Sequence, residues 1–599
     1  MMPPPEADTP QRLRSSVSAI HNHRSPNGLR WCQALLLALP VAAGAQSNSP
    51  SVAPTLPDAG SVTRQLDSSR PTETTRQPLP TELDGPPPPR PGAASVVIRS
   101  FVLHGQTALS DEILQAALLP WLNTPLDLAG LQSAAERVAA TYQRYGRMAT
   151  TRLGRQDVTD GVLTIHIQEA RFAATRMGGK LPERVRPQQL LDFAAAQLRP
   201  GELLDTDAMN RALLLMDDLP GVAVTGSLAP GERPGDTELV LEVADDVLLS
   251  GSAQLDNAGS RSVGAERVTL QLSLNSPLGW GDQAQLNALV SEGSRYLRLG
   301  YGLPLGPGGQ RVQAWASQVD YRVISADFAG LQARGRSSTV GGSATWPVLR
   351  SRMANLNVSL MGESKRYHNS AAGSVSSHYG GRSLQAELSG NLFDNRWGGG
   401  ANSAAVSATA GQIDLAGSPN QAADAVSART AGRYQRWNVQ LTRQQNLPGD
   451  ASLFISASAQ YSARNLDSAE RMSLGGLSGV RAYPANEASG SSGQLVRVEF
   501  RRRLTDQWVL AGFYDTGRIR VYAQPLSPSG QSLLDTGAPN NYGLSGAGAY
   551  AIWTPLPSAQ LQATVARRIG QHPSPSASGA YQDGSRRAIQ AWFSATLSF

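Results

Sequence analysis

The stretch VTLQLSLN, residues 268–275, alternates apolar and polar residues one by one. Successive side chains of a β-strand point to opposite faces, whereas one face of a helix recurs about every 3.6 residues. The period of two therefore predicts a strand with one apolar face, Val268 to Leu274, and one polar face, Thr269 to Ser273.

The same alternation recurs to the C-terminus. NLNVSLM (residues 355–361) and AWFSATLSF (residues 591–599) again divide apolar and polar side chains between two faces. Connections rich in Gly, Ser, Asn and Pro separate such runs, and the helical period disappears from about residue 247 onward. Residues 247–599 are therefore predicted to be all-β.

Two architectures are compatible with this alternation. A soluble β-sandwich turns its apolar faces inward, whereas a transmembrane β-barrel turns them toward lipid and keeps a polar lumen. Long polar connections, the lack of disulfides and a predicted export signal favour the barrel. At about 20–22 residues per strand and connection, residues 247–599 hold about 16 antiparallel strands.

The N-terminus has the pattern of a targeting segment. Scattered arginines precede the apolar run WCQALLLALPVAAGA, residues 31–45, which ends in Ala43-Gly44-Ala45. This pattern predicts a signal peptide at residues 1–45; a membrane anchor is disfavoured because the run is too short and lacks a stop-transfer flank. Cys32 is the single cysteine, so the exported chain is predicted to have no disulfide.

Residues 46–94 are rich in proline and predict an extended linker, with one exception. In PDAGSVTRQLDSS, Asp58 has the position of a helix cap, and Val62 and Leu66 are spaced i, i+4. A helix over residues 58–68 is too short to be stable alone, so we expect it to dock against another part of the protein.

Residues 95–170 and 171–246 each predict a small α+β domain. Both contain the order strand, two helices, two strands, as in SVVIRSFVLHG followed by SDEILQAALLPWL in the first. The two segments share this order although their sequences differ. They are predicted to be one fold used twice.

Signals of catalysis and of nucleic-acid binding are weak. The net charge is +6 and the pI about 9.5, but the arginines are scattered rather than clustered. The histidines have no metal-ligand spacing, and no G-x-S-x-G occurs. GAGAYA, residues 546–551, fits G-x-G-x-x-A without its strand–helix context, which favours a glycine-bearing strand. We predict no enzyme activity, no cofactor, no metal site and no nucleic-acid partner.

The order of these segments resembles the haemolysin secretion/activation family (ShlB/FhaC/HecB type) of two-partner secretion transporters. YQRYGRMATTRLGRQDVTDGVLTIHIQEARF resembles the end of the first polypeptide-transport-associated (POTRA) domain in that family. MDDLPGVAVTGSLAPGERPGDTELVLEV resembles the end of the second, and LDNAGSRSVGAERV with NSPLGWGDQ resembles the entry into the barrel. The resemblance implies two POTRA domains followed by a 16-stranded barrel with a loop folded into its lumen.

Two short motifs carry the candidate site. GVRAYP (residues 479–484) resembles the V-R-G-Y/F tip of the family's inward loop, and FYDTG (residues 513–517) resembles its F-x-D-x-G strand motif. The residues alone leave open that the two charges are solvated turn residues. The resemblance implies that Arg481 meets Asp515, through paired hydrogen bonds between guanidinium and carboxylate. The residues that it implies at this contact are Val480, Arg481, Tyr483, Phe513, Asp515 and Gly517; Ala482 departs from the usual glycine.

The resemblance implies an outer-membrane translocator in a Gram-negative bacterium, with its POTRA domains in the periplasm. Its implied partners are an unfolded exoprotein, such as a haemolysin or adhesin, and outer-membrane lipid. It also implies that the helix at residues 58–68 plugs the barrel. Alternatives are a related outer-membrane assembly factor, which commonly has more POTRA domains, a diffusion porin, which would not need residues 95–246, and an enzyme within a barrel.

Overall fold

The computed structural model describes residues 56–67, 94–534, 538–575 and 579–599. The predicted signal peptide and most of the predicted proline-rich linker lie outside these residues. Within the described residues, no helix has the length and apolar character needed to cross a membrane.

The first small unit has a three-stranded sheet covered by two helices. Its elements are β1 (Val96–Val97), β2 (Ser100–His104), α2 (Asp111–Leu118), η1 (Leu119–Trp121), β3 (Pro125–Leu126), α3 (Leu128–Arg144), β4 (Ala149–Arg152) and β5 (Val162–Glu169). The sheet order is β2-β5-β4, with β2 parallel and β4 antiparallel to β5. Asp127 caps α3 by accepting a hydrogen bond from Gly130 N, and Trp121 and Tyr142 are buried between helices and sheet.

The second small unit repeats this topology. Its elements are β6 (Arg171–Gly178), α4 (Pro187–Gln197), α5 (Thr206–Asp217), β7 (Val222–Pro230) and β8 (Asp236–Asp245). The sheet order is β6-β8-β7, with β6 parallel and β7 antiparallel to β8. The first and last strands of both units are therefore parallel neighbours, which supports the prediction that one fold is used twice.

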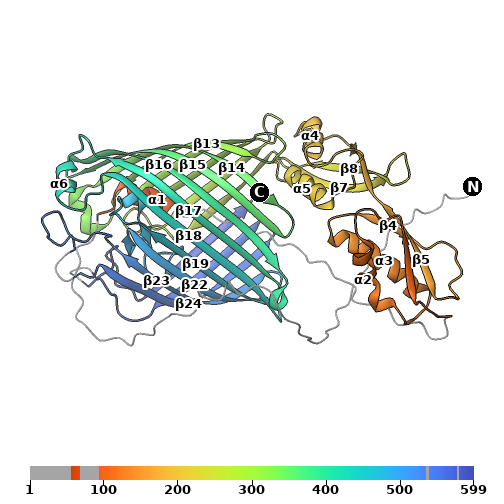
Figure 1. Ribbon diagram of the computed structural model, residues 1–599. Coiled ribbons are helices and arrows are strands. Elements are labelled where there is room, and N and C mark those ends of the chain that lie inside the picture. The colour runs from red at the N-terminus through yellow and green to blue at the C-terminus, as the bar shows by residue number, and fades with distance from the viewer. Residues whose placement is uncertain (1–55, 68–93, 535–537, 576–578) are drawn as a thin grey trace, which may run out of the picture. The chain divides into compact units, whose positions relative to one another are not determined.

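Among the described residues, sixteen strands close into a barrel in which every neighbouring pair is antiparallel. They are β9 (Leu249–Asp256), β10 (Arg267–Asn275), β11 (Gln283–Ser291), β12 (Ser294–Pro304), β13 (Arg311–Arg322), β14 (Arg334–Arg350), β15 (Ala354–Ala371), β16 (Ser374–Asp394), β17 (Gly400–Asp414), β18 (Gly432–Leu447), β19 (Ala451–Tyr461), β22 (Ser492–Arg503), β23 (Trp508–Arg520), β24 (Asn541–Leu556), β25 (Ala559–Arg568) and β26 (Ile589–Ser598). Figure 1 shows this cylinder from the side, and the pairing of β26 with β9 closes it. The predicted strand number is confirmed.

The apolar face of the strands is the outer face. Val340 on β14 and Leu384 on β16 are 64% and 53% exposed, whereas Tyr367 on β15 is 1% exposed and faces inward. A soluble sandwich would bury the first two side chains. The exposed apolar surface therefore supports the transmembrane barrel and excludes the sandwich.

The two ends of the barrel differ in their connections. Tight turns join strands at the end where β9 begins, as at residues 351–353 and 448–450. The opposite end has long connections, among them residues 462–491, 521–540 and 569–588. Short helical segments lie in several connections: η2 (Ala326–Leu331), η3 (Arg396–Gly398), α6 (Gln421–Val426) and η4 (Ser468–Glu470).

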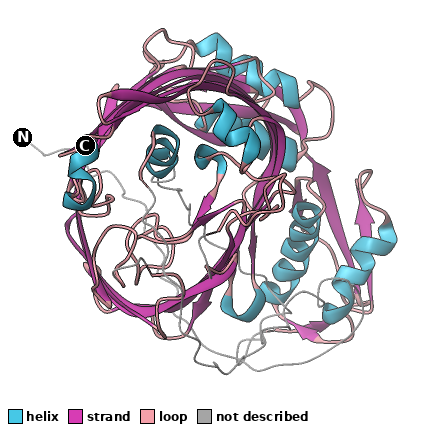
Figure 2. Ribbon diagram, turned by 90° about the vertical axis from the view of Figure 1, so that its left-hand side faces the viewer, coloured by secondary structure: helices cyan, strands magenta, loops and turns pink. Residues whose placement is uncertain are grey.

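Helix α1 (Ala59–Asp67) lies inside the ring of strands (Figures 1 and 2). Asp58 caps it as predicted, because Asp58 Oδ1 accepts a hydrogen bond from Ser61 N at 2.8 Å. Val62 and Leu66 are 3% and 8% exposed and pack in one apolar cluster with inward-facing tyrosines of the wall. Docking against the barrel thus stabilises a helix that is too short to persist alone.

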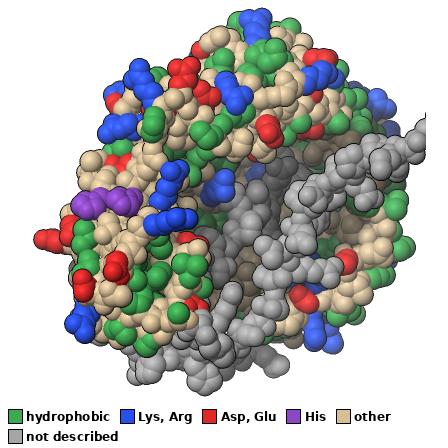
Figure 3. Space-filling model, turned by 90° about the vertical axis from the view of Figure 1, so that its right-hand side faces the viewer, with side chains coloured by type: hydrophobic (Ala, Val, Ile, Leu, Met, Phe, Trp, Pro, Cys, Tyr) green, Lys and Arg blue, Asp and Glu red, His purple; other side chains and the backbone are tan. Residues whose placement is uncertain are grey.

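Charged side chains do not gather into a patch of one sign on the face shown in Figure 3. Lys and Arg side chains are interspersed there with Asp and Glu side chains. This distribution agrees with the scattered arginines of the sequence.

Candidate functional site in the barrel lumen

The connection between β19 and β22, residues 462–491, folds back into the barrel and is here called the inward loop. Its base is a two-residue ladder between β20 (Met472–Ser473) and β21 (Ser489–Gly490). Gly479 lies so close to Leu474 that an added Cβ would be 1.9 Å from the Leu474 carbonyl oxygen. Glycine is therefore required for the tight fold that presents the tip.

Arg481 at the tip forms a bidentate ion pair with Asp515 on β23. Arg481 Nε lies 2.8 Å from Asp515 Oδ2, and Nη2 lies 2.7 Å from Oδ1. The backbone N–H of Arg481 donates to the same carboxylate at 3.1 Å. The two side chains are 5% and 1% exposed, so water competes little with the contact. The structure thus brings the two sequence-predicted charges together.

Glu499 on β22 is a second carboxylate partner of Arg481. Its Oε1 lies 2.8 Å from Arg481 Nη1, while its Oε2 accepts hydrogen bonds from Arg501 and from the Tyr550 hydroxyl. The Arg481 guanidinium also lies 3.5 Å from the centroid of the Phe513 ring. Two carboxylates and an aromatic face therefore surround one buried cation, which offsets its desolvation.

The remaining sequence-predicted residues lie around this contact. Val480 and Tyr483 are buried on the loop side, and Phe513 lies beneath the guanidinium on the wall. Gly517 lets the loop approach β23, because an added Cβ would lie 2.9 Å from the Leu474 side chain. All six predicted residues thus lie in or next to the interface between tip and wall.

Ala482 fits because the wall opposite it has no side chain. An added Cβ at Gly546 on β24 would lie 2.3 Å from the Ala482 methyl group. Ala482 is fully buried and is not among the described residues with positive φ, so it adopts the tip conformation without left-handed strain. GAGAYA is a glycine-bearing strand, as expected: Gly546 faces the loop, and Gly548 makes room for the Phe513 ring.

A second external connection, whose described residues are 569–575 and 579–588, contacts the inward loop. His572 Nε2 lies 2.6 Å from Glu487 Oε1, and the backbone N–H of Gln582 donates to Glu487 Oε2 at 2.9 Å. The rings of Tyr483 and Tyr581 meet edge to face at 5.8 Å between centroids. The loop is thus held from the wall on one side and by this connection on the other.

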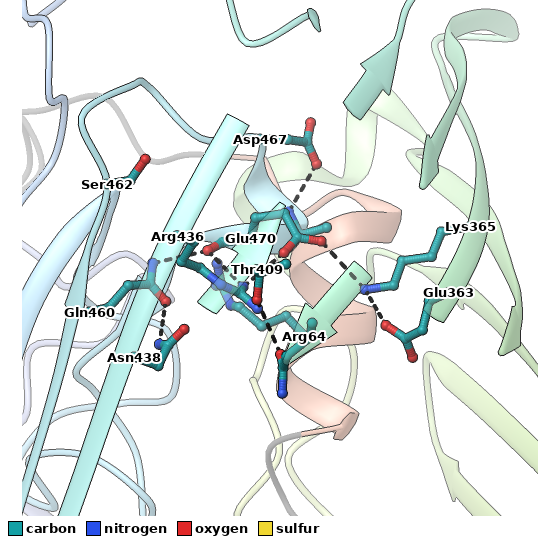
Figure 4. A network of polar contacts seen from close by, with 12 residues as sticks. Arg64, Glu363, Lys365, Thr409, Arg436, Asn438, Gln460, Ser462, Asp467 and Glu470 are labelled. Carbon is teal, nitrogen blue, oxygen red and sulfur yellow. Dashed lines mark hydrogen bonds and ion pairs between the residues drawn. The ribbon is translucent and has the colours of Figure 1, made fainter. Parts of the chain in front are cut away.

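The base of the inward loop is fixed to the barrel wall at β18 and β15 through Glu470 (Figure 4). Glu470 Oε2 lies 2.8 Å from Arg436 on β18, and its Oε1 lies 3.4 Å from Lys365 on β15. Lys365 also pairs with Glu363 at 3.0 Å. Because Glu470 is 4% exposed at its side chain, this network fixes the path of the chain where it enters the lumen.

Helix α1 contacts the same loop through hydrogen bonds from Arg64 to uncharged acceptors. Arg64 donates to the Ser468 carbonyl oxygen at 2.6 Å and to Asn486 Oδ1 at 3.4 Å (Figure 4 shows Arg64). Ala59 N donates to Asn369 Oδ1 on β15 at 2.9 Å. An added Cβ at Gly60 would lie 2.5 Å from Ser468 Oγ, so helix and loop approach closely.

Sequence reasoning did not identify Glu499, Gly546 or Glu487. A signal for Glu499 exists, because Val496, Val498 and Phe500 alternate with Arg497, Glu499 and Arg501, which places three charges on the lumenal face of β22. Gly546 and Glu487 carry no such signal. Their importance depends on which segments the tertiary fold brings together.

Comparison with known sequences identifies the family. The profile of the haemolysin secretion/activation protein ShlB/FhaC/HecB matches residues 235–535, and the ShlB-type POTRA domain matches residues 96–170. The chain therefore belongs to the ShlB/FhaC/HecB family of two-partner secretion transporters. It is located in the outer membrane, and its POTRA region lies in the periplasm.

Relatives and solved structures agree with this assignment. The heme/hemopexin transporter protein HuxB of Haemophilus influenzae is 23% identical over 78% of this chain and 82% of its own. The outer membrane transporter CdiB of Escherichia coli is 25% identical over 71% of each chain. The structure of CdiB from Escherichia coli superposes with a TM-score of 0.61 at 21% identity, covering 90% of this chain and 96% of that one. BamA from Haemophilus ducreyi, lacking POTRA domains 1–3, shares the fold with a TM-score of 0.53 at 13% identity, covering 84% of this chain and all of the other.

Proposed function

We propose that this transporter captures an unfolded exoprotein in the periplasm, releases α1 from the lumen and passes the exoprotein through the space that α1 leaves. The observation that supports this sequence of steps most directly is the seating of α1. Hydrogen bonds to uncharged acceptors and three small or medium apolar side chains, without an ion pair among the described residues, hold it against a wall and loop that are themselves fixed by buried ion pairs. The helix is therefore the part of the lumenal filling that leaves at the lowest free-energy cost.

The two small units offer edges for capture. β4 and β2 are the edge strands of the first sheet, and β6 and β7 are those of the second, among the described residues. An unpaired strand edge can add an extended peptide through main-chain hydrogen bonds, which demands no single side-chain sequence. Such edges suit a substrate that arrives unfolded.

Space next to α1 supports its displacement. A cavity of about 630 Å³ borders the helix, and Asp58, Arg64 and Asn486 are among its lining residues. A helix with one unpacked flank has fewer contacts to break. The sequence contains no nucleotide-binding motif, so we propose that folding of the exoprotein outside the cell biases the movement outward, and that the chain performs no catalysis.

Deletion of residues 95–246 tests the capture step. The truncated barrel and the full chain are each co-expressed with a very large exported protein encoded by the neighbouring gene. The barrel should still insert, as judged by its heat-modifiable migration, while the exoprotein stays in the periplasm. Secretion without residues 95–246 would contradict capture by these units and would favour a simple channel.

Removal of the whole protein from the cell tests the alternative of an outer-membrane assembly factor. Loss of an assembly factor lowers the amounts of unrelated barrels in the outer membrane, whereas loss of a dedicated translocator removes one exoprotein from the medium. We expect normal amounts of unrelated barrels in cells that lack this protein. A general decrease would contradict the proposed role.

A further inference from the structure

Arginines mark a boundary on the outer face of the barrel. On β16, Arg382 is directed outward and is followed on the same face by Leu384 and Leu388, which are 53% and 48% exposed. On β18, Arg433 precedes Trp437 on the outer face, and Trp437 is 52% exposed. The apolar side chains belong to the band that contacts hydrocarbon, so the arginines lie at the level of lipid headgroups.

This boundary belongs to the external side of the membrane. β9 continues from the periplasmic units, so the end where β9 begins is the periplasmic end. Arg433 is the second residue of β18 and directly follows the external connection from β17. The headgroups next to these arginines are therefore those of the outer leaflet.

The arginines line a groove of about 620 Å³, here called the arginine groove. Its principal residues are Arg382, Leu384, Arg433, Trp437, Tyr461 and Arg464. Gln412 on β17 is paired in register with both Arg382 and Arg433, so these three residues form one row across three strands. Adjacent strands lie about 4.8 Å apart, which places the two arginine backbones about 10 Å apart.

The positive charges of the groove arginines have few carboxylate partners within the protein. In the described parts of the chain, Arg382 and Arg433 form no ion pair, and Asp414, which is two residues beyond Gln412 on β17, forms none with either arginine. Arg464 donates to the carbonyl oxygens of Arg433 at 2.9 Å and of Arg429 at 3.3 Å. The guanidinium of Arg464 is thus held in place without a carboxylate.

A second outer groove differs in this respect. It contains Arg295, Arg322, Arg334 and Arg336, together with Glu292 and Asp320. Asp320 forms an ion pair with Arg336, so part of the positive charge there is matched within the protein. The arginine groove differs from this second groove because none of its arginines forms an ion pair with a carboxylate among the described residues.

We propose that the arginine groove binds a doubly phosphorylated, acylated glycolipid of the outer leaflet. Guanidinium groups bind phosphate through paired, charge-assisted hydrogen bonds, and two separate arginines suit two phosphates better than one. Leu384, Trp437 and Tyr461 continue the groove toward the apolar band and contact acyl chains. The assignment rests on the outer-membrane location and does not depend on the proposed secretion steps.

The test is a binding titration of the full mature chain in detergent, followed by native mass spectrometry. The probes are lipid A with two phosphates, lipid A with one phosphate, and phosphatidylglycerol. Arg382→Gln/Arg433→Gln should weaken binding of the doubly phosphorylated lipid about tenfold. Binding of the other two lipids should be weaker in the wild type and should change less in the variant.

Arg352→Gln/Arg502→Gln is the matched control, because it removes two exposed arginines near turns at the periplasmic end. It should change the affinity by less than about twofold. Equal affinity of the groove variant and the wild type would overturn the proposal, and so would an equal loss in the control. Equally tight binding of phosphatidylglycerol would overturn the assignment to a doubly phosphorylated glycolipid. Heat-modifiable migration of both variants verifies that the barrel is folded.

Discussion

The tip of the inward loop and helix α1 share the barrel lumen, but different contacts hold them. Arg481 at the tip has two carboxylate partners, and the side chains of Arg481, Asp515 and Glu499 are each at most 5% exposed. Arg64 on α1 donates to carbonyl, amide and hydroxyl oxygens, and it forms no ion pair within the residues that the structure describes. Ion pairs with two carboxylates thus hold the tip, whereas apolar packing and hydrogen bonds from Arg64 to uncharged acceptors hold the helix.

This difference indicates a division of labour inside one lumen. Removing a partner from a buried ion pair leaves an uncompensated charge and costs about 3–5 kcal/mol, whereas a hydrogen bond from a charged donor to an uncharged acceptor contributes about 1.5–3 kcal/mol net. In the proposed transport cycle α1 leaves the lumen, and contacts of the second kind are the ones that permit this. A part that shapes the remaining passage needs contacts of the first kind.

Locking α1 in place should have the largest effect. In Gly60→Cys/Ala469→Cys, the new Cβ at position 60 would lie 3.1 Å from that of residue 469 and 2.9 Å from its backbone N, so the helix must shift by a few tenths of an ångström to reach the usual disulfide span of about 3.5–4.5 Å. The oxidised variant should secrete no exoprotein, because the helix cannot leave, and a reductant should restore secretion. Each single-cysteine variant is the control. Normal secretion by the oxidised, verified cross-link would show that α1 does not need to leave.

Breaking the ion pair between Arg481 and Asp515 should have the next largest effect. Arg481→Ala leaves Asp515 buried without its bidentate partner and should lower the free energy of unfolding by about 3–5 kcal/mol, together with secretion. Arg481→Ala/Asp515→Ala should lose less than the sum of the single variants, because the two residues interact directly. Unfolding in detergent and secretion assays measure both quantities.

Arg502→Ala is the control for this series, since Arg502 is exposed at the periplasmic end of β22. It should leave both readouts unchanged. If the losses of stability in the two single variants add up in the double variant, a direct interaction between the tip and β23 is contradicted.

Disturbing the steric fit between the tip and the wall should have an effect of intermediate size on stability. Gly546→Ala places a methyl group against that of Ala482 and should destabilise the protein by about 1–3 kcal/mol. Ala482→Gly/Gly546→Ala exchanges the two groups and should recover most of this loss. Gly512→Ala is a matched control, because nothing lies within 4 Å of an added Cβ there. Failure of the exchange to recover stability would show that the close contact is not the cause.

The smallest effect is expected from weakening the seat of α1. Arg64→Met retains much of the side-chain length but removes its hydrogen bonds to the inward loop, at a cost of about 1.5 kcal/mol or about tenfold in helix occupancy. Channel conductance in planar bilayers should therefore show more frequent opening, while secretion continues. Arg366→Met, at an exposed position on β15, is the control. Unchanged conductance in Arg64→Met would contradict a weakly held helix.

Much of this architecture could be predicted from local pattern. Alternation along segments such as residues 268–275 predicts strands, and their number follows from the length of the region because lipid requires a closed sheet. The cap at Asp58 and the spacing of Val62 and Leu66 predict α1 for a similarly local reason. The pairing of Arg481 with Asp515 could be expected from motifs that resemble a known family.

The unpredicted parts are contacts between segments distant in the sequence. Ala482 fits because Gly546 is opposite it on a strand more than sixty residues away, and no local rule specifies that neighbour. Glu487 meets His572 through the folding of two external connections, which have no periodic pattern. Such contacts depend on the closed barrel, so they cannot be predicted before the register of its strands is known.

The position of α1 along the chain has a kinetic consequence. Twenty-six residues separate Asp67 from Ala94, so a helix released as proposed stays covalently tethered within about 90 Å even at full extension of the chain. Re-entry into the lumen is therefore intramolecular, at a local concentration of about millimolar, and is independent of how many copies the membrane holds. In the proposed cycle the pore therefore reseals after each passage through return of the helix that belongs to the same chain.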